Sequence, residues 1–319
     1  MINKLIVASV FTGAFFAFGQ NEIDVYRYSN TYVQGSARFD AMGGSFGALG
    51  AESGCIGINP AGFGRASISS FSFGLNGTTT KTTSHFRGNG EPTSFGTSSM
   101  EAFKMRVPNL AGTIVSDVST GNSGLIYTQI SFGINRVANF DNSFNYSGQQ
   151  FESLLDVYAA GASGIAPADL YTYQTYTGSL AYQTYTIDPD VNNNYYPRLN
   201  SGDVIHNRTV LNRGGINEYY LAISANYLDK IYFGGSVSYN TLNFSESVIH
   251  RETLTDTTGV SLRSFVYQYD YKTKGGGTNV KLGAIFVPYD FLRLGVAVHT
   301  PTFYQLTDES TATMQALHN

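Results

Sequence analysis

One short motif in this sequence has the residue types and spacing of a catalytic nucleophile. Residues 43–47, Gly-Gly-Ser-Phe-Gly, match the G-x-S-x-G pattern, in which a serine on a sharp turn between a strand and a helix attacks a carbonyl group. The match falls inside a glycine-rich run, where such matches arise by chance. We therefore expect no hydrolytic site at Ser45 and no enzymatic activity.

The other residues with possible chemistry give no better candidate for catalysis. Five histidines are scattered along the chain: His85, His206, His250, His299 and His318. Their spacing does not suit zinc, and neither a phosphate-binding loop nor a dinucleotide fingerprint is present. The sequence therefore predicts no metal and no cofactor.

Two arginines are candidate contacts for an anionic headgroup. Arg208 and Arg213 close a long polar stretch in the middle of the chain. A guanidinium group binds a carboxylate through two parallel hydrogen bonds. The alternative, that both arginines are solvated loop charges, stays open.

A glycine-rich segment, residues 35–65, differs in composition from everything around it. Its glycines, which include Gly43, Gly44, Gly47 and Gly62, leave too little side chain for an independent core. Its apolar residues, Phe46, Leu49, Ile56 and Ile58, are too numerous for a solvated linker. Such a segment needs walls from elsewhere, and we predict a compact plug inside, or under, a sheet.

The chain begins with the pattern of an export signal. Residues 1–20 combine Lys4, an apolar run and the small residues Ala17 and Gly19, which are spaced for signal peptidase. The alternative is a membrane anchor, but about 14 apolar residues fall short of the roughly 20 that cross a bilayer. We expect residues 1–19 to be removed on export.

The composition narrows the class of protein. The net charge is -4 and 13% of residues are charged, so no basic surface for nucleic acid is expected. The chain has 23 tyrosines, 22 phenylalanines and 35 glycines, a composition that indicates a β-rich protein. Its one cysteine, Cys55, has no partner for a disulfide. No window approaches 18 consecutive apolar residues, so we expect any membrane insertion to use strands.

From residue 68 the hydrophobic period is two, which predicts strands with one apolar and one polar face. The apolar faces carry Phe71, Phe73, Ile130, Phe132, Leu221, Ile223, Phe233, Val237, Val280, Leu282, Leu294 and Val296. The opposite faces carry Asn, Gln, Ser and Gly, which suits a wet lumen. The phase slips near Thr241, where we expect a β-bulge.

The connections favour a membrane barrel over a soluble sandwich, which also alternates. Tight turns are predicted at 228–230 and 288–291, and long loops at 77–99, 147–213 and 249–262, at alternate ends of the strands. Outer-membrane barrels have this asymmetry. Tyrosines near strand ends suit the boundary between lipid and water. We predict an all-β fold, an antiparallel transmembrane β-barrel.

The long insertion carries an apolar stripe with helical spacing: Phe151, Leu154, Leu155 and Tyr158. Two interpretations stay open. The stripe is a landing surface for a hydrophobic ligand, or it packs on the insertion's own Tyr176, Leu180, Tyr182 and Tyr185.

The sequence resembles the FadL-type outer-membrane transporters of long-chain fatty acids and aromatic hydrocarbons, particularly their Bacteroidetes branch. The resemblance rests on GSARFDAMGGSFGALG with INPAGFGR (35–65), NYLDKIYFGGSVSYNTLNF (226–244) and TKGGGTNVKLGAIFVPYDFLRLGVAVHTPTFY (273–304). It implies a fourteen-stranded barrel, an N-terminal hatch in its lumen, and outer-loop helices that form a hydrophobic groove. In such proteins the ligand passes from the groove to a pocket beside the hatch, and leaves sideways through the wall after the hatch rearranges.

Carried over residue by residue, the resemblance makes Asn59, Pro60 and Ala61, with Gly62, part of the hatch motif. It places Leu154, Leu155 and Tyr158 in the capturing loop. The expected parts are a signal peptide (1–19), a hatch (20–65) and a partial barrel (66–319) with the outer loop 147–213. About seven strands are apparent, about half of what this family needs, and the last residues, TATMQALHN, are not an alternating strand that ends in an aromatic residue, the usual assembly signal of such barrels. We therefore expect an N-terminal part of a longer transporter.

The predicted function is passive import of a hydrophobic small molecule across the bacterial outer membrane. Its expected partners are that ligand, membrane lipid and the machinery that assembles outer-membrane barrels. A structural barrel or surface adhesin is the alternative. The sequence does not separate an acyl chain from an aromatic ring as the ligand, and does not determine the oligomeric state.

Overall fold

The computed structural model describes residues 22–32, 34–86, 97–119, 123–199, 204–256, 258–259 and 261–318. The chain divides into two compact units, residues 1–32 and 33–319. The described part of the first unit holds one helix, α1 (Glu22–Ser29), whose Ile23, Val25 and Tyr26 are exposed. The first residues of the predicted hatch (20–65) belong to the first unit and the others to the second. The predicted signal peptide lies outside the described residues.

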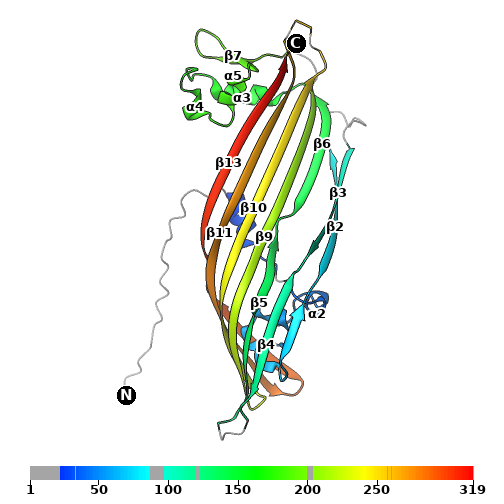
Figure 1. The fold of residues 1–319 in the computed structure, drawn as a ribbon, viewed down its shortest axis with the longest axis vertical. Helices are drawn as coiled ribbons and strands as arrows, with labels where there is room; N and C mark the ends of the chain where they lie inside the picture. The colour runs from blue at the N-terminus through cyan, green and yellow to red at the C-terminus, as the bar shows by residue number, and fades with distance from the viewer. Residues whose placement is uncertain are drawn as a thin grey trace, which may run out of the picture. The chain divides into compact units, whose positions relative to one another are not determined.

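The second unit is built on a nine-stranded antiparallel sheet (Figure 1). Its main path runs β1 (Ser70–Phe73), β4 (Asn109–Asp117), β5 (Leu125–Asn139), β9 (Val204–Tyr227), β10 (Ile231–Leu254), β11 (Leu262–Tyr289) and β12 (Leu292–His299). β6 (Asn142–Gln150) also pairs with β9, and β13 (Phe303–His318) also pairs with β11. β2 (Asn76–His85) and β3 (Thr97–Arg106) form a separate hairpin. The predicted antiparallel all-β class is confirmed.

In its described part the chain runs along the strand direction seven times, as β1–β2, β3–β4, β5–β6, β9, β10, β11 and β12–β13. Four of these seven passes are interrupted, at residues 74–75, 107–108, 140–141 and 300–302. Pro108 and Pro301 lie at two of the breaks, since proline lacks the N–H that a ladder needs. Residues 311–318 differ from the expectation in one respect: they form an alternating strand that pairs with β11, although, as expected, the stretch contains no Phe, Tyr or Trp.

The turn at 228–230 joins β9 to β10 as predicted. Leu228 and Asp229 have φ values of 54° and 55°, and the Asn226 side chain donates to Asp229 Oδ1 at 2.8 Å. The predicted long loops are shorter than expected, because polar, threonine-rich residues extend the strands. Much of 77–99 lies in β2 and β3, β10 reaches Leu254, and the insertion occupies 151–203 instead of 147–213.

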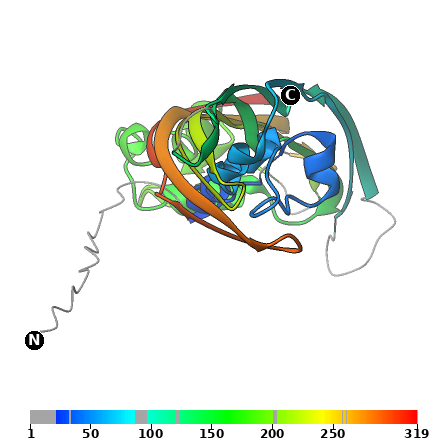
Figure 2. The same cartoon turned by 90° about the horizontal axis from the view of Figure 1, so that it is seen from below.

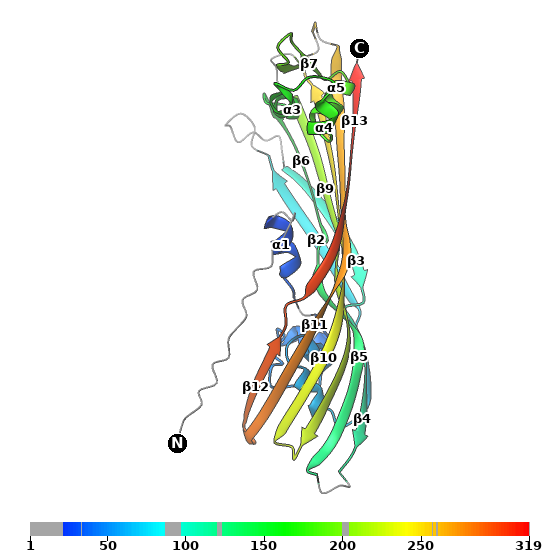
Figure 3. The ribbon, with the colours of Figure 1, turned by 90° about the vertical axis from the view of Figure 1, so that its left-hand side faces the viewer.

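The insertion folds into α3 (Leu154–Ala162), α4 (Leu170–Tyr173), α5 (Gly178–Gln183) and the hairpin β7 (Ile187–Pro189) with β8 (Tyr195–Pro197). Ser153 and Asp156 form a capping box at the start of α3. These elements lie at the end of the strands where β13 finishes (Figure 3). Every helix in the described part of the chain is too short or too polar to cross a bilayer.

The glycine-rich segment holds α2 (Ala37–Ala41) and two 3₁₀ turns, η1 (Ser53–Gly57) and η2 (Pro60–Arg65). Figure 2, seen from below, shows η1 and η2 on the inner side of the curved sheet. Phe39, Phe46, Cys55, Ile56 and Phe63 form a buried cluster with Ala111, Tyr220 and Ala222 of the sheet. The sheet thus supplies the walls that this composition requires.

The two faces of the long strands exchange character halfway along, as β10 shows. In residues 231–240, the turn half, Ile231, Phe233 and Val237 are exposed on the outer face, while Ser236 and Ser238 are buried on the inner face.

In residues 241–254, the loop half, Leu242, Phe244 and Val248 are buried inside, and Asn243 and Arg251 are exposed outside. The pairing with β9 and β11 continues through Thr241 without a register shift. The predicted bulge is therefore wrong: the phase slip in the sequence marks a change of surroundings.

The exposed apolar face of the turn half continues across the sheet. Phe71, Leu221, Val237 and Leu294 are 75%, 58%, 59% and 54% exposed. They belong to β1, β9, β10 and β12, so the face runs over the whole width of the described sheet. The oily side chains predicted to face outward do so.

Candidate functional site

Asn59 fastens the glycine-rich segment to the sheet. Its side chain is buried, and its Nδ2 donates to the carbonyl oxygens of Gly47 (2.8 Å) and Ala284 (3.2 Å). Its Oδ1 accepts from the backbone N–H of Ala61 at 3.0 Å and so caps η2, which begins with Pro60. One amide group therefore joins two parts of the segment to β11.

Glycines of the sheet let the backbone of the segment approach closely. A Cβ atom at Gly234 would lie 2.6 Å from the carbonyl oxygen of Pro60. One at Gly283 would overlap the Asn59 side chain, and one at Gly295 would overlap the carbonyl oxygen of Gly47. The Asn-Pro motif thus meets glycines of β10 and β11, and Gly47 meets a glycine of β12.

The four glycines predicted for the hatch have different roles. Gly43 and Gly44 form the turn after α2 with φ values of 59° and 72°. Gly47 accepts the hydrogen bond from Asn59, and Gly62 packs against Cys55, where a Cβ would lie 2.8 Å from Sγ. Ser45 follows this turn and not a strand, so the setting of a nucleophile elbow is missing there.

Polar side chains of the inner face complete the attachment. Gln129 of β5 donates to the carbonyl oxygens of Gly64 and Ala66 at 3.1 and 2.9 Å. Asn109 accepts from Ser53 at 3.0 Å, and His299 Nε2 lies 3.0 Å from the carbonyl oxygen of Ile58. Sequence reasoning did not single out these residues as contacts, although Gln129 and His299 lie on strand faces predicted to be polar; Asn109 lies outside the predicted strands.

The thiol of Cys55 lies at the centre of the packed segment. It is fully buried, and burial raises its pKa to about 12. Only a thiolate reacts rapidly with alkylating reagents, so Cys55 is inert while the segment stays packed.

A hollow of about 420 Å³ lies beside the segment. Glu52, Ser53 and Phe63 line it from the segment, and Ser72 and Thr113 from β1 and β4. Its lining mixes polar and aromatic groups.

A buried ion pair lies on the inner face. Lys281 Nζ of β11 is 2.5 Å from Glu218 Oε1 of β9, and both residues are nearly inaccessible to solvent. Asn240 and Asn279 lie on the same face and donate to Tyr304 and Thr302. Each charge of the pair therefore offsets the cost of burying the other.

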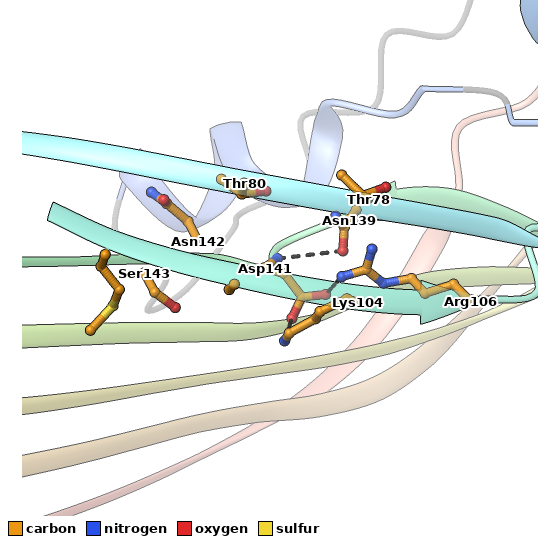
Figure 4. A pocket seen from close by; sticks show the side chains of 10 residues that line it. Thr78, Thr80, Lys104, Arg106, Asn139, Asp141, Asn142 and Ser143 are labelled. Carbon is orange, nitrogen blue, oxygen red and sulfur yellow. Dashed lines mark hydrogen bonds and ion pairs between the residues drawn. The ribbon is translucent and has the colours of Figure 1, made fainter.

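An unpaired seam separates β3 from β6. Within the described residues, the ladder partner of β3 is β2, and that of β6 is β9. At the seam, Asp141 binds Lys104 at 2.6 Å and also binds Arg106 (Figure 4). The seam coincides with the break between β5 and β6, so the wall there is held by side chains and not by a backbone ladder.

The structure separates the two arginines predicted to bind a headgroup. Arg213 lies on the outer face of β9, close enough to Lys104 for their charges to interact. Arg208 lies on the inner face and interacts with Tyr158 and Tyr267 below the insertion. They do not form one anion site.

The apolar stripe of the insertion points mainly inward. Leu155 and Tyr158 are 0% and 7% exposed, and they pack with Leu170 and Ile187 of the insertion. The same cluster includes Leu254, Leu262, Phe265, Tyr267 and Met314 of the strands. Leu154 is half-buried against it. For Leu155 and Tyr158 the packing matches the interpretation that the stripe packs within the insertion. It also packs on the strands, which was not expected.

Apolar side chains remain exposed on the outer surface of the insertion. These are Phe151, Val157, Tyr171 and Tyr173. Phe151 was among the predicted capture residues, whereas Val157 was not, because helical spacing alone does not tell which side of a helix meets the strands.

Comparison with known proteins adds little to this geometry. No protein-family model and no curated protein matches the sequence. Similar solved structures include a mutant of the Rh. blastica porin (8% identity, TM-score 0.11) and OmpT, an outer membrane protein of Vibrio cholerae (11%, 0.10). The alignments cover 77% and 78% of this chain and 100% of those chains. Scores this low establish no common fold, so the FadL-type resemblance stays a prediction.

Proposed function

We propose that this protein is an outer-membrane transporter that imports hydrophobic small molecules passively, as FadL-type proteins do. The observation that carries the proposal is the arrangement of the turn half, with apolar side chains exposed outside and polar ones buried inside. A soluble protein rarely exposes a contiguous apolar patch above a few hundred Å². The outer apolar stretch of β10, residues 231–239, also matches the roughly 9–11 residues of a tilted strand that crosses a bilayer.

The glycine-rich segment is suited to the role of a hatch. Hydrogen bonds donated by Asn59 and Gln129, one accepted by Asn109 from Ser53, and backbone contacts at glycines hold it, and no disulfide bond does so in the described residues. Each hydrogen bond contributes only about 0.5–1.5 kcal/mol. A rearrangement of the segment must also separate its buried cluster, Phe39, Phe46, Cys55, Ile56 and Phe63, from the sheet, so we expect it to need the binding energy of a ligand.

The remaining parts supply a route. The exposed apolar side chains of the insertion offer a first contact for a ligand, and the hollow beside the hatch offers a second position. Within the described residues no backbone ladder joins β3 to β6, so an exit at this seam would break no ladder between these two strands. An apolar ligand that leaves sideways stays out of water.

Uptake by liposomes tests the proposal. The full-length protein is reconstituted, and entry of labelled oleate and labelled toluene is compared with protein-free liposomes. We expect faster entry of at least one of them, with no change for labelled glucose. Equal rates with and without protein would end the importer hypothesis.

A surface adhesin is the second candidate, favoured by the exposed Tyr171 and Tyr173 of the insertion. Gln150 and Val204 are ladder partners, so a two-residue turn can replace residues 151–203 and join β6 to β9 as a hairpin. An importer loses uptake in this variant. An adhesin keeps uptake unchanged and loses attachment of cells to surfaces.

A further inference from the structure

Two histidines that are far apart in the sequence meet beneath the insertion. His206 of β9 is the ladder partner of Glu252 of β10, and His250 lies two residues before Glu252 on the same inner face. His250 Nε2 is 2.7 Å and His206 Nδ1 is 3.3 Å from Glu252 Oε1. One ligand atom from each residue lies within 4.8 Å of the other two, and the residues are 8%, 4% and 0% exposed. The spacing of these histidines in the sequence gave no sign of this.

The carboxylate of Glu252 is held in place by the start of α3. Ser153 Oγ donates to Oε2, and the backbone N–H of Leu154 donates to Oε1 at 2.8 Å. Burial acts to raise the pKa of this carboxyl, but the hydrogen bonds from His250, Ser153 and Leu154 outweigh it and hold the pKa below its usual value. Carboxylates that bind metals are themselves hydrogen-bonded in this way.

Hydrogen bonding among the three side chains does not account for the cluster by itself. When His250 donates through Nε2 to Glu252, its buried Nδ1 is left without a partner in the described structure. A buried polar atom without a partner costs about 1–3 kcal/mol. A cation bound between the three side chains would take the place of the proton on Nε2, while Nδ1 would carry the remaining proton; the case for a cation therefore rests on the convergence of the three buried ligand groups.

The surroundings are dry and shaped by aromatic rings. Phe86 stacks on His206 with ring centroids 6.0 Å apart, and Phe265 lies 6.3 Å from His250. Arg208, the ladder partner of His250, brings a positive charge to the same face. This positive charge repels a bound cation, so we expect a lower affinity for the ion than at zinc sites with four protein ligands.

We propose that His206, His250 and Glu252 bind a divalent transition-metal ion, with Zn²⁺ as the best match. Two imidazole nitrogens and one carboxylate oxygen are a common zinc donor set, which leaves a fourth position for water. The bound ion links β9 to β10 and, through Glu252, fixes the start of α3. The site is structural: it clamps the insertion to the strands, and it does not depend on the proposed transport function.

Metal titration of the full chain, refolded in detergent without a histidine tag, tests the proposal. Calorimetry with Zn²⁺ alone should show one site per chain, and Co²⁺ should give the intense visible absorption of a four-coordinate complex. His206→Gln leaves Glu252 bound to Ser153, Leu154 and His250, so this variant should fold, and its affinity for Zn²⁺ should fall at least about tenfold. His250→Gln should behave in the same way.

His85→Gln is the matched control, because His85 is exposed on β2 and lies outside the cluster. It should bind Zn²⁺ as the unchanged protein does. Absence of binding to the unchanged protein overturns the proposal. Equal loss of affinity in His85→Gln and His206→Gln, or no loss in either, overturns it as well.

Discussion

At the scale of single residues, Asn59 concentrates the contacts between the glycine-rich segment and the sheet. Its amide bonds two backbone carbonyl oxygens and one N–H group, and Ala284 lies 225 residues away in the chain. Asn59→Ala removes these bonds and leaves buried backbone groups without partners. We expect the free energy of unfolding in detergent to fall by about 2–3 kcal/mol. Asn243→Ala on the exposed outer face serves as the control, and an equal loss in both variants would contradict this role for Asn59.

Cys55 reports on the same contacts. Since its buried thiol has a pKa of about 12, labelling by a maleimide at pH 8 should be very slow in the unchanged protein. Asn59→Ala should speed the labelling, because loosening of the segment exposes the thiol and lowers its pKa towards the ordinary value. Mass spectrometry follows the reaction at the one cysteine of the chain. Rapid labelling of the unchanged protein would mean that the segment is not firmly packed.

At the scale of elements, the fit of η2 against β10 depends on one glycine face. Gly234 points inward, where a Cβ would meet the backbone oxygen of Pro60 at 2.6 Å, and a carbonyl cannot move aside alone. Its neighbour Gly235 points outward, where a Cβ would meet only the flexible end of Leu282 at 3.1 Å. Replacing either glycine by alanine changes the intrinsic strand propensity by the same amount. The two substitutions therefore form a matched pair that differs only in what the new Cβ meets.

Gly234→Ala should lower the free energy of unfolding by about 1–3 kcal/mol through overpacking, whereas Gly235→Ala should change it little. Gly234→Ala should also speed the labelling of Cys55, since displaced η2 no longer covers η1. Chemical denaturation and the labelling assay measure both effects. Similar values for the two variants would show that the segment does not press on β10.

At the scale of the whole molecule, the exchange of faces along β10 defines a band that should face lipid. Val237 and Asn243 lie on the same outer face of one strand, the first inside the band and the second beyond it. Val237→Arg should weaken insertion into bilayers by about 2–4 kcal/mol, the cost of an arginine near the middle of the membrane. Asn243→Arg should cost much less.

Folding into liposomes from urea, followed by the shift in gel mobility of folded protein, compares the two variants. An equal cost at both positions, or none at either, would place Val237 outside the lipid and remove the main support for a membrane protein.

Several features of this protein follow from local sequence. The alternation around Leu221 and Val237 determines which side chains share a face, since the period of two belongs to any extended backbone. The turn at 228–230 depends on its own residues, and the glycine-rich composition of 35–65 by itself requires walls built by another part of the chain. These were predictable because each depends on neighbours within a few residues.

Other features depend on partners that are distant in the chain. The surroundings of each face of β10 change at Thr241. Pairing with β11 makes residues 311–318 a strand. The strands next to the insertion bury Tyr158. Asn59 meets Ala284, and His206 meets His250 and Glu252, only because the strands align in one register. Local pattern determines the orientation of a side chain within its strand, but the groups that it touches depend on long-range packing, which no short window of sequence contains.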